Sequence, residues 1–455
     1  MTSTRMLPAT TRARKTLLAV GIALIGSAAH AQSATEAELA RKLDQLAAEL
    51  AAVKAQLAQM QKERASTSAA APTPAAATST AAAPAATAGP ATTPAANTST
   101  AAAPSGNEPS TVLTSYGEIN YNHPTRASQD AQADVRRFVL GYQHRFDAKT
   151  KVVTELEVEH AVASADDSGE VEVEQAYIER QLTPLWAARA GLFLMPVGLL
   201  NENHEPTAFY GVERNFVETA IIPSTWREGG LQVVGNFDNG LTVQGGITTG
   251  FDLTKWDAAS DEGRESPLGS IHQELQLAKA RDLSVFGAVN WRGVPGLLLG
   301  GSLFTGNASQ GQLASSSRIT LWDLHARWTP GRFDLSTVYT RGTISNTAAL
   351  NTTLVGNPTL IPKSFDGWYV QGAYKAWTSD DYALAPFVRW EQFNTAKSYA
   401  ALGPGLTPDA APTERVITLG ANFQVSSAIV LKADYQRFRE NKDLNRWNLG
   451  LGWSF

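Results

Sequence analysis

The sequence ends in RWNLGLGWSF, residues 446–455, and every second residue of this stretch is apolar. One face of the extended chain would carry Trp447, Leu449, Leu451, Trp453 and Phe455. A period of two predicts a β-strand. Such an apolar face would favour aggregation at the edge of a soluble sheet. It is typical of a strand that meets lipid, with an aromatic residue at the membrane boundary. We therefore predict a transmembrane β-barrel whose last strand pairs with its first.

Residues 1–31 have the pattern of a secretory signal peptide. Four positive charges precede an apolar run at residues 17–25, and Ala29 and Ala31 supply small residues for cleavage. The run is too short for a membrane-spanning helix. Cleavage would leave a chain more acidic than the net charge of −5, which argues against nucleic acid as a partner. The chain has no cysteine, which excludes disulfides and thiolate chemistry.

Residues 32–64 are predicted to form a short coiled-coil helix. Its apolar residues are spaced alternately four and three apart, at Leu39, Leu43, Leu46, Leu50, Val53, Leu57 and Met60. This narrow stripe favours an oligomeric coiled coil over the alternative, a single amphipathic helix packed on a domain. Residues 65–110 are rich in Ala, Pro, Thr and Ser, which predicts a disordered linker.

Residues 111–455 are predicted to form the barrel, an all-β domain of sixteen antiparallel strands. Short connections alternate with long ones, as the two rims of an outer-membrane barrel require. This alternation places the coiled coil in the periplasm, and sixteen strands imply a water-filled lumen. The candidate strands are residues 111–121, 134–146, 151–161, 170–181, 185–195, 226–236, 239–251, 282–292, 296–306, 317–328, 332–344, 366–376, 382–394, 413–424, 428–439 and 444–455.

The two faces of the candidate strands differ in polarity. In residues 382–394, Val388 and Trp390 would face outward while Arg389 faces inward. A charge on the lipid face would cost roughly 2–4 kcal/mol at mid-bilayer, so charged residues should line the lumen. The basic residues predicted to line the pore wall are Arg137, Arg145, Arg189, Arg292, Arg327, Lys375, Arg389 and Lys432.

The third long connection, residues 196–230, is predicted to fold into the lumen and constrict it. A surface loop of this length is normally polar, but this one carries apolar residues such as Leu199, Val217 and Ile221. The alternative is an external lid or a contact between subunits. The charged residues predicted to lie at the constriction are Glu202, His204, Glu205, Glu213, Arg214, Glu218, Arg227 and Glu228.

Three motifs in this loop and the terminal WSF resemble the bacterial phosphate- and polyphosphate-selective porin family. The motifs are NENHEP at 201–206, FYGVERN at 209–215 and IIPSTWRE at 221–228. The resemblance covers about residues 111–455. It implies a trimer of sixteen-stranded channels in the outer membrane of a Gram-negative bacterium, with this loop inside each pore. It also implies anion preference through ladders of Arg and Lys, and a C-terminal strand, with Trp453 and Phe455, that the barrel assembly machinery reads.

The charge pattern of this sequence departs from such a ladder. The loop has five Glu against two Arg, and the basic wall residues are spread round the barrel. Two neighbouring strands instead carry an acidic wall of Glu155, Glu157, Glu159, Glu170, Glu172 and Glu174. These carboxylates predict a cation route or a divalent-ion site, or else a solvated wall balanced by arginines.

The predicted function is therefore that of an outer-membrane porin for passive diffusion of small hydrophilic solutes or ions, with anions such as phosphate among the candidates. No cofactor is expected. Alternatives are a structural barrel anchored to peptidoglycan through its coiled coil, and a barrel hydrolase. The hydrolase is disfavoured because no histidine has a recognisable nucleophile context, and HEP at 204–206 lacks the second His of a zinc motif.

Overall fold

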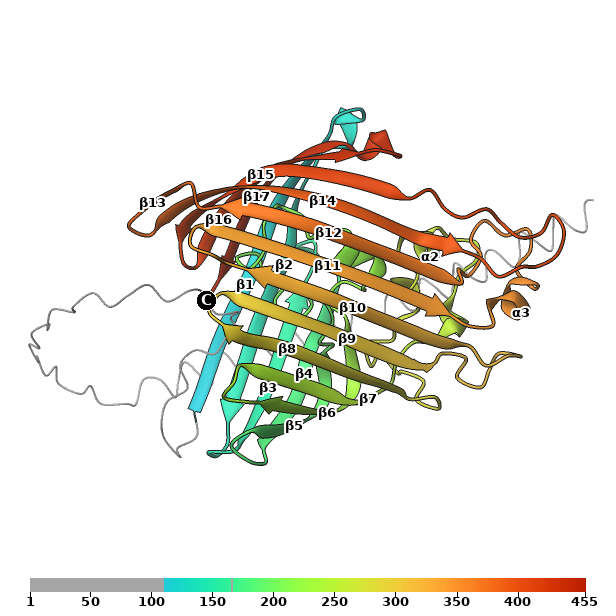
Figure 1. Ribbon diagram of the computed structural model, residues 1–455, viewed down its shortest axis with the longest axis horizontal. Coiled ribbons are helices and arrows are strands. Elements are labelled where there is room, and N and C mark those ends of the chain that lie inside the picture. Colours follow the sequence, from blue (N-terminus) through green and yellow to red (C-terminus); the bar gives the residue numbers. More distant parts are fainter. Residues whose placement is uncertain (1–109, 165–166) are drawn as a thin grey trace, which may run out of the picture. The chain divides into compact units, whose positions relative to one another are not determined.

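The predicted strands pair in sequence order and close into an antiparallel barrel (Figure 1). The computed structural model describes residues 110–164 and 167–455. The predicted signal peptide, coiled coil and all but the last residue of the linker lie outside the described residues. Their assignments therefore stay predictions.

The strand bounds agree closely with the sequence prediction. They are β1 Ser110–Pro124, β2 Gln132–Arg145, β3 Thr150–Val158, β4 Val171–Gln181, β5 Trp186–Leu194, β6 Arg227–Asn236, β7 Leu241–Thr248, β8 Ser284–Val294, β9 Leu297–Asn307, β10 Arg318–Trp328, β11 Phe333–Ile344, β12 Ser364–Tyr374, β13 Trp377–Ser379, β14 Tyr382–Ser398, β15 Glu414–Ser426, β16 Ile429–Phe438 and β17 Arg446–Ser454.

The short strand β13 is not an additional wall strand. Both β12 and β13 pair with β14, and only Lys375 and Ala376 separate them. They therefore act as one interrupted strand, which confirms the predicted sixteen. The largest difference in length is at β7, which was predicted at residues 239–251 and covers only Leu241–Thr248. Strand β14, predicted to end at residue 394, continues to Ser398.

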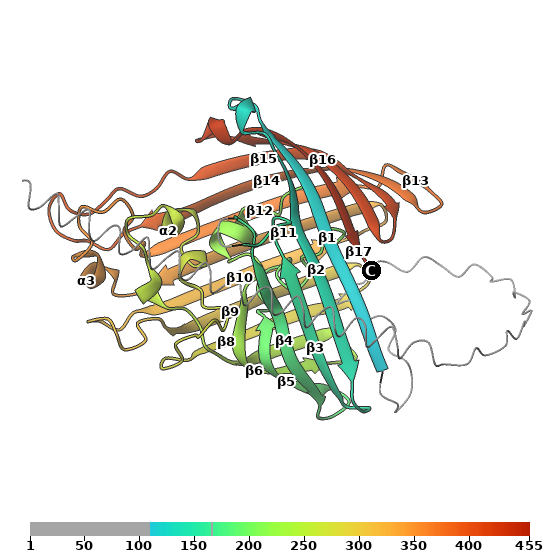
Figure 2. The same ribbon diagram turned by 180° about the vertical axis from the view of Figure 1, so that it is seen from behind.

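The last strand closes the barrel, as its sequence predicted. Strand β17 pairs with β1 from Tyr116 opposite Ser454 to Pro124 opposite Arg446 (Figure 2). Phe455 extends this pairing, because its N–H and carbonyl group both bond to Ser115, at 2.9 and 3.0 Å. No edge of the sheet is left unpaired, which removes the aggregation hazard of an exposed strand.

Apolar and polar residues alternate across the wall. On β17 the outward Trp447 is 59% exposed, whereas the neighbouring inward Asn448 is 1% exposed. The faces predicted for β10, β12 and β14 are also observed: Leu324, Val370 and Val388 are exposed outside. Asp323 and Arg389 are buried inside.

The two rims differ in the length of their connections. One, which we call the short-turn rim, has only tight turns, and β13 and the C-terminus lie there (Figure 1). The other, the long-loop rim, carries the short helices η1 Ser128–Asp130, η3 Leu253–Lys255, α2 Glu262–Glu265, η4 Gly269–Ile271, α3 Thr347–Asn351 and η5 Lys442–Leu444, while η2 Val217–Ile221 lies in the third loop. None of the helices in the described part of the chain is long and apolar enough to cross a membrane.

An apolar cluster fills part of the lumen near the long-loop rim. Trp226 stacks on Phe251 at 5.1 Å between ring centroids and meets Phe304 edge-on at 4.8 Å. Inward residues of β3 to β5 and of β8 to β12, with the loop between β7 and β8, complete the cluster. The predicted water-filled lumen is narrowed in this sector by more than loop 3, because residues of the loop between β7 and β8 such as Leu268 and Ile271 also pack inside.

Candidate functional site: a loop folded across the barrel

The third long loop, hereafter loop 3, covers residues 195–226 and has a closed neck. The Asn201 amide nitrogen donates to the carbonyl oxygens of Met195 and Trp226, at 2.7 and 2.8 Å. Its amide oxygen accepts from the Trp226 N–H at 2.7 Å. One buried side chain thus joins the two ends of the loop beside the ends of β5 and β6.

The middle of loop 3 is hydrogen-bonded to inward side chains of the facing wall. The Asp434 carboxylate on β16 accepts from the Val212 N–H at 2.6 Å. The Arg389 guanidinium on β14 donates to the Tyr210 carbonyl oxygen at 3.1 Å. Because these wall residues face the lumen, the loop lies inside the barrel, where the sequence prediction had put it.

Further contacts hold the same segment from β14, β15 and β16. The Lys432 ammonium lies 3.5 Å from the centroid of the Phe209 ring, in a cation–π contact. The Asn422 amide donates to the Phe209 carbonyl oxygen at 3.1 Å. On β14, the Glu391 carboxylate accepts from the Phe216 N–H at 2.7 Å. Lys432 and Arg389, predicted to line the pore wall, therefore fasten loop 3 instead of standing free in water.

The glycines of the C-terminal stretch make room for loop 3. A Cβ added to Gly450 would lie 3.2 Å from Val212 Cγ1, and one added to Gly452 would lie 2.5 Å from Pro206 Cβ. Both glycines face inward, opposite the apolar outer face of β17. Their small size is thus explained by the loop that packs on them.

Glu218 organises the second half of loop 3. Its carboxylate accepts from the N–H groups of Leu199 and Leu200, at 2.6 and 2.8 Å, and from the Asn215 amide at 2.8 Å. The Tyr369 hydroxyl on β12 also donates to it, at 3.1 Å. Burial raises the pKa of Glu218, although these hydrogen bonds oppose the rise. The sequence predicts Glu218 at the pore surface, but in the structure its carboxylate stabilises the fold of loop 3.

His204 joins loop 3 to the wall formed by β1 and β4. Its Nε2 lies 2.6 Å from the Tyr116 hydroxyl and 3.5 Å from Glu174 Oε1. The Tyr116 hydroxyl in turn donates to Glu174 Oε2 at 2.7 Å. The other ring nitrogen of His204 lies 2.9 Å from the Asn201 carbonyl oxygen, so the histidine links the wall to the neck.

Two arginines lie among these carboxylates. Arg137 on β2 pairs with Glu118 at 2.9 Å and approaches Glu157 at 3.6 Å. Arg214 on loop 3 donates to two hydroxyl groups of its own loop, at 2.8 Å each. Burial, and then the nearby Arg137, lower the pKa of Arg214 to about 10, so it keeps its positive charge at neutral pH.

We call this group of charged residues the constriction cluster; it comprises Glu118, Arg137, Glu155, Glu157, Glu174, His204, Glu205 and Arg214. It holds five carboxylates against two guanidinium groups. One carboxylate oxygen each of Glu157, Glu174 and Glu205 lacks a hydrogen-bond partner within the described structure. Two of these atoms keep longer ion-pair contacts, Glu157 Oε1 with Arg137 at 3.6 Å and Glu174 Oε1 with His204 at 3.5 Å. Their unfilled hydrogen-bonding capacity would favour a water molecule or a cation beside them.

Charged side chains remain partly open on both sides of the cluster. Toward the long-loop rim, Glu172 is 23% exposed and contacts Arg227, which also pairs with Glu274 at 2.9 Å. Toward the short-turn rim, Lys151 is 31% exposed and pairs with Glu179 at 3.1 Å. Two other residues of the predicted acidic wall lie at the long-loop rim: Glu159 follows β3 and Glu170 precedes β4. The Glu159 N–H donates to the Glu170 carbonyl oxygen at 3.0 Å.

The remaining predicted residues are dispersed. The carboxylate of Glu202 accepts from the Gln244 amide at 3.1 Å, and that of Glu213 from the Asn122 amide at 2.8 Å. Glu228 is fully buried, and its carboxylate accepts hydrogen bonds from Trp226, Thr249 and Gly250. It therefore stabilises the chain where loop 3 joins β6.

Among the basic residues nearer the short-turn rim, Arg327 reaches loop 3 indirectly, because its partner Asp334 accepts from the Tyr210 hydroxyl at 3.3 Å. Arg189 pairs with Glu179 at 2.7 Å and Arg327 with Asp334 at 2.7 Å. Lys375 lies in the break between β12 and β13, Arg145 ends β2, and Arg292 is exposed near the end of β8. These residues do not form one ladder along the lumen.

Sequence reasoning missed the wall residues that hold loop 3, among them Tyr116, Tyr369, Asn422 and Asp434. Each occupies an inward position of a strand, so period two could have placed it inside. Nothing in the sequence indicates which of them meets the loop. No three His, Asp or Glu side chains in the described ranges are arranged to hold a metal ion, so the acidic wall lacks a ready divalent-ion site.

Comparison with known proteins gives the fold but no family. No protein-family model matches the chain. Over 354 residues it is 27% identical to an uncharacterized protein of Aquifex aeolicus, covering 75% of this chain and 79% of that one. Salmonella typhi OmpF in a complex with daunomycin matches with a TM-score of 0.52 and 13% identity, covering 76% of this chain and 97% of that one. The outer membrane channel DcaP of Acinetobacter baumannii matches with a TM-score of 0.51 and 12% identity, with the same coverages. At such low identity, the likeness establishes the barrel fold alone.

The packing of loop 3 on β17 predicts the effect of Gly452→Leu. A leucine side chain would collide with Pro206, and overpacking of this kind costs about 1–3 kcal/mol. We expect loop 3 to detach and the buried Arg214 to become open to trypsin, with cleavage about tenfold faster than in the wild type. The measurement is limited proteolysis of the folded barrel, with the cut mapped by mass spectrometry.

The matched control is Gly287→Leu on β8, an outward-facing glycine whose added Cβ would come no closer than 3.8 Å to a neighbour. This variant should resist trypsin as the wild type does. Equal resistance of Gly452→Leu, in a barrel with normal heat-dependent gel mobility, would contradict the packing described here.

Proposed function

We propose that this protein is an outer-membrane porin that passes small hydrophilic ions by diffusion and favours cations. The observation that carries the proposal is a closed barrel with an apolar exterior and an acidic constriction cluster beside loop 3. The low-identity structural relatives are outer-membrane channels, which supports the proposal without naming the solute.

The exterior supports a membrane location. Outward residues near mid-strand are Leu, Val, Ile and small residues, as contact with lipid requires. Exposed aromatic residues near the short-turn rim form one girdle, with Tyr142, Phe146, Trp328, Phe333, Tyr374, Trp377 and Tyr382 among its members. Aromatic girdles lie at membrane–water interfaces, so this rim would face the periplasm and the long-loop rim the outside.

The exposure of charged residues supports a route along β1 to β5. Lys151 and Glu172, at opposite ends of this wall, are partly open, whereas Glu174 between them is fully buried. The apolar cluster around Trp226 fills the lumen along β8 to β12 and also includes Val153 on β3 and Tyr177 on β4. An ion crossing the barrel would therefore pass the constriction cluster, where low-dielectric walls strengthen the effect of each fixed charge.

The charges of the cluster support cation preference over phosphate transport. Three more carboxylates than guanidinium groups surround the proposed route, and the basic residues predicted to form a ladder are paired, dispersed or engaged with loop 3. The predicted membership in a phosphate-selective family therefore stays a prediction, and an anion preference would need a different arrangement of charge.

Planar bilayer recording tests this function directly. We expect stable ohmic conductance and, in a tenfold KCl gradient, a reversal potential of the sign for K⁺ over Cl⁻. Burial raises the pKa of Glu205, so its charge is lost at a higher pH than for an ordinary glutamate, and cation preference should weaken as pH falls. Absence of conductance would refute the porin, and a preference for Cl⁻ would refute the cation route.

The paired variant Glu157→Gln with Glu174→Gln isolates the cluster, because glutamine keeps the shape and still accepts the Tyr116 hydrogen bond. It should move the reversal potential clearly toward Cl⁻. Glu262→Gln, on the exposed helix α2, is the control and should change nothing. A cluster variant that behaves like this control would place the selectivity elsewhere.

Self-association is part of the proposal, in agreement with the resemblance to trimeric porins. Near the long-loop rim, the outward residues of β3, β4, β7 and β8 are Val158, Val173, Ile247 and Val285, so no aromatic girdle continues there. In the loop between β7 and β8, the Leu275 side chain packs over Gly229 of β6, and Leu277 is fully exposed. Aliphatic residues without an aromatic girdle, beside an exposed leucine, are what we expect of a surface that contacts a second copy of the protein instead of lipid.

We therefore expect Leu277→Glu to weaken the oligomer. A carboxylate buried between subunits would be desolvated without a partner. The variant should run as a smaller species on semi-native gels and in light scattering, with unchanged circular dichroism. Leu406→Glu, on the exposed loop between β14 and β15, is the control. An oligomer unaffected by Leu277→Glu would contradict this assignment of the interface.

The structural anchor remains an alternative that rests on the predicted coiled coil, outside the described residues. The hydrolase has no observation in its favour: in the described ranges, the histidine rings bond to Tyr, Thr, Asp, Glu and Asn groups and not to a serine hydroxyl. Recognition of Trp453 and Phe455 by the assembly machinery also stays a proposal. Trp453 covers Gly117 on the outer face of β1, so it contributes to barrel closure as well.

A further inference from the structure

A second aromatic girdle lies near the long-loop rim, mainly on β10 to β17, with Tyr121 on the adjoining β1. Its other members form three outward-facing pairs on neighbouring strands. The ring centroids are 5.3 Å apart for Trp322 and Tyr339, 5.2 Å for Trp368 and Trp390, and 4.5 Å for Tyr435 and Trp447. If the girdle at the short-turn rim marks the periplasmic membrane–water interface, this partial girdle marks the membrane–water interface on the outer side.

Three arginines lie just beyond this girdle on the same outward face, and we call them the arginine arc. Arg341 follows Tyr339 by two residues on β11, and Arg437 follows Tyr435 by two on β16. Arg415 is on β15 between β14 and β16. Residues two apart on a strand share a face, so the guanidinium groups extend toward the headgroup region.

The arc has few partners within the protein. Arg415 donates to the Gln392 side chain at 3.2 Å. The side chains of Arg341 and Arg437 make no hydrogen bond or ion pair with the described residues. Arg415 and Arg437 occupy diagonal positions on neighbouring strands, which are about 7–8 Å apart. Two guanidinium groups at this spacing are able to share one phosphate.

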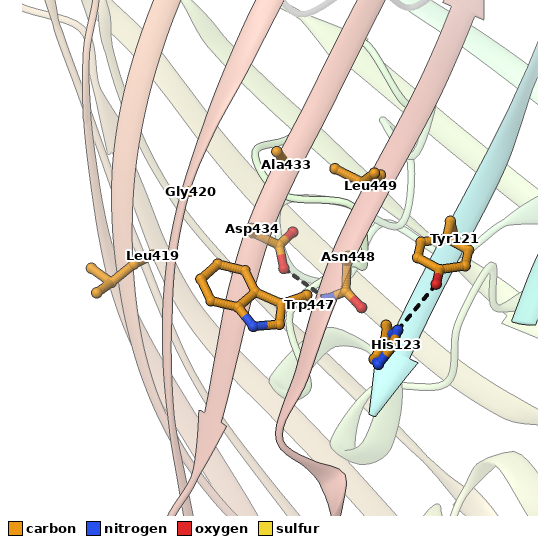
Figure 3. Close-up of a pocket in the computed structure, with 9 residues that line it drawn as sticks. All are labelled: Tyr121, His123, Leu419, Gly420, Ala433, Asp434, Trp447, Asn448 and Leu449. Atoms are coloured by element: carbon orange, nitrogen blue, oxygen red, sulfur yellow. Dashed lines mark hydrogen bonds between the residues drawn. The ribbon is translucent and has the colours of Figure 1, made fainter. Parts of the chain in front are cut away.

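An apolar groove of about 380 Å³ lies below the arc on the outside of β15, β16, β17 and β1 (Figure 3). Its floor includes Ala433, and larger residues such as Leu419, Trp447 and Leu449 flank it. Ala433 precedes Arg437 by four residues on the same face of β16, or ~13 Å along the strand. This is the direction in which an acyl chain descends from its headgroup.

A second copy of this protein fits the arc poorly. The outward residues at the corresponding level of β3, β4, β7 and β8 are apolar and offer no carboxylate to the arginines. Asp366, an outward acid within the girdle, is already paired with Lys397. The charge of the arc and the apolar groove together match a molecule with a phosphate at one end and a hydrocarbon chain at the other.

We propose that the arginine arc and the groove bind a phosphate-bearing lipid of the outer leaflet, with its phosphate on Arg415 and Arg437 and an acyl chain over Ala433. This inference rests on the outer-membrane location in the proposed function. Arginine binds phosphate with charge-assisted hydrogen bonds, and burial of each methylene adds apolar stabilisation. Binding of this lipid would fix the depth at which this side of the barrel lies in the membrane.

The test is lipid retention by the full-length protein in detergent, followed by native mass spectrometry with two probes: lipid A carrying its phosphates and the same lipid with its phosphates removed. The phosphorylated probe should bind about tenfold more tightly. Inorganic phosphate at equal concentration should not displace it, because it lacks the acyl chains. Equal binding of both probes, or displacement by free phosphate, would overturn the proposal.

Two variants separate the headgroup from the chain. Arg415→Gln with Arg437→Gln should lose the phosphate preference, whereas Ala433→Phe should weaken binding of both probes by filling the groove. Arg332→Gln, at the short-turn rim, is the control and should bind as the wild type does. Wild-type affinity in both test variants would overturn the site.

Conductance recorded from the same preparations distinguishes this inference from the proposed function. Normal channels without selective retention of the phosphorylated lipid would refute the lipid site alone. Cross-linking through the arc between copies would also refute it, because it would assign this face to self-association.

Discussion

Loop 3 carries backbone N–H and carbonyl groups across the interior of a barrel, and each of these groups needs a hydrogen-bond partner. An unsatisfied buried group costs about 1–3 kcal/mol, so a loop of this length is stable inside only if the wall supplies partners. Asp434, Glu391 and Arg389 do so, while Glu218 satisfies the loop's own N–H groups. The inward charges of β14 and β16 are therefore first of all a support for the loop.

This constraint divides the lumen into sectors with different chemistry. Where loop 3 meets β14 to β17, wall side chains bind its backbone and two glycines admit its side chains. Where its ends meet β8 to β12, aromatic and aliphatic residues exclude water. The remaining sector, along β1 to β4, keeps carboxylate oxygens without hydrogen-bond partners in the described structure. Proposed ion passage belongs to this sector because fixed charges there are still available to a solute.

The sequence alone predicts the barrel well because the wall repeats one local rule. Alternation of apolar and polar residues fixes each strand and its two faces, and connection lengths fix the two rims. The break at Lys375 and Ala376 and the extension of β14 to Ser398 escape this rule, since pairing with a neighbour determines them. The outward aromatic residues were equally visible in the sequence, but their arrangement into a full and a partial girdle requires the register.

The site was less predictable because its contacts join residues far apart in the chain. Charge alone placed Glu218, Glu228, Lys432 and Arg389 on a wet surface, yet the structure uses them to hold loop 3 or its ends. Glu155, Glu157 and Glu174 lie on strands β3 and β4 and follow the strand period, whereas Glu159 and Glu170 of the predicted acidic wall lie beyond the strand ends. The partners of those carboxylates, Arg137 and His204, could not be inferred from spacing.

The most direct measurement of the central claim is a disulfide between loop 3 and β17. The chain has no cysteine, so Val212→Cys with Gly450→Cys introduces a single defined pair at positions in contact. After mild oxidation of the protein folded in membranes, we expect nearly complete cross-linking within one chain, seen as a shift in gel mobility that a reductant reverses. Conductance should change little, because the bond would join groups that already touch. A folded barrel in which the two cysteines stay reduced would contradict the placement of loop 3 and the constriction derived from it.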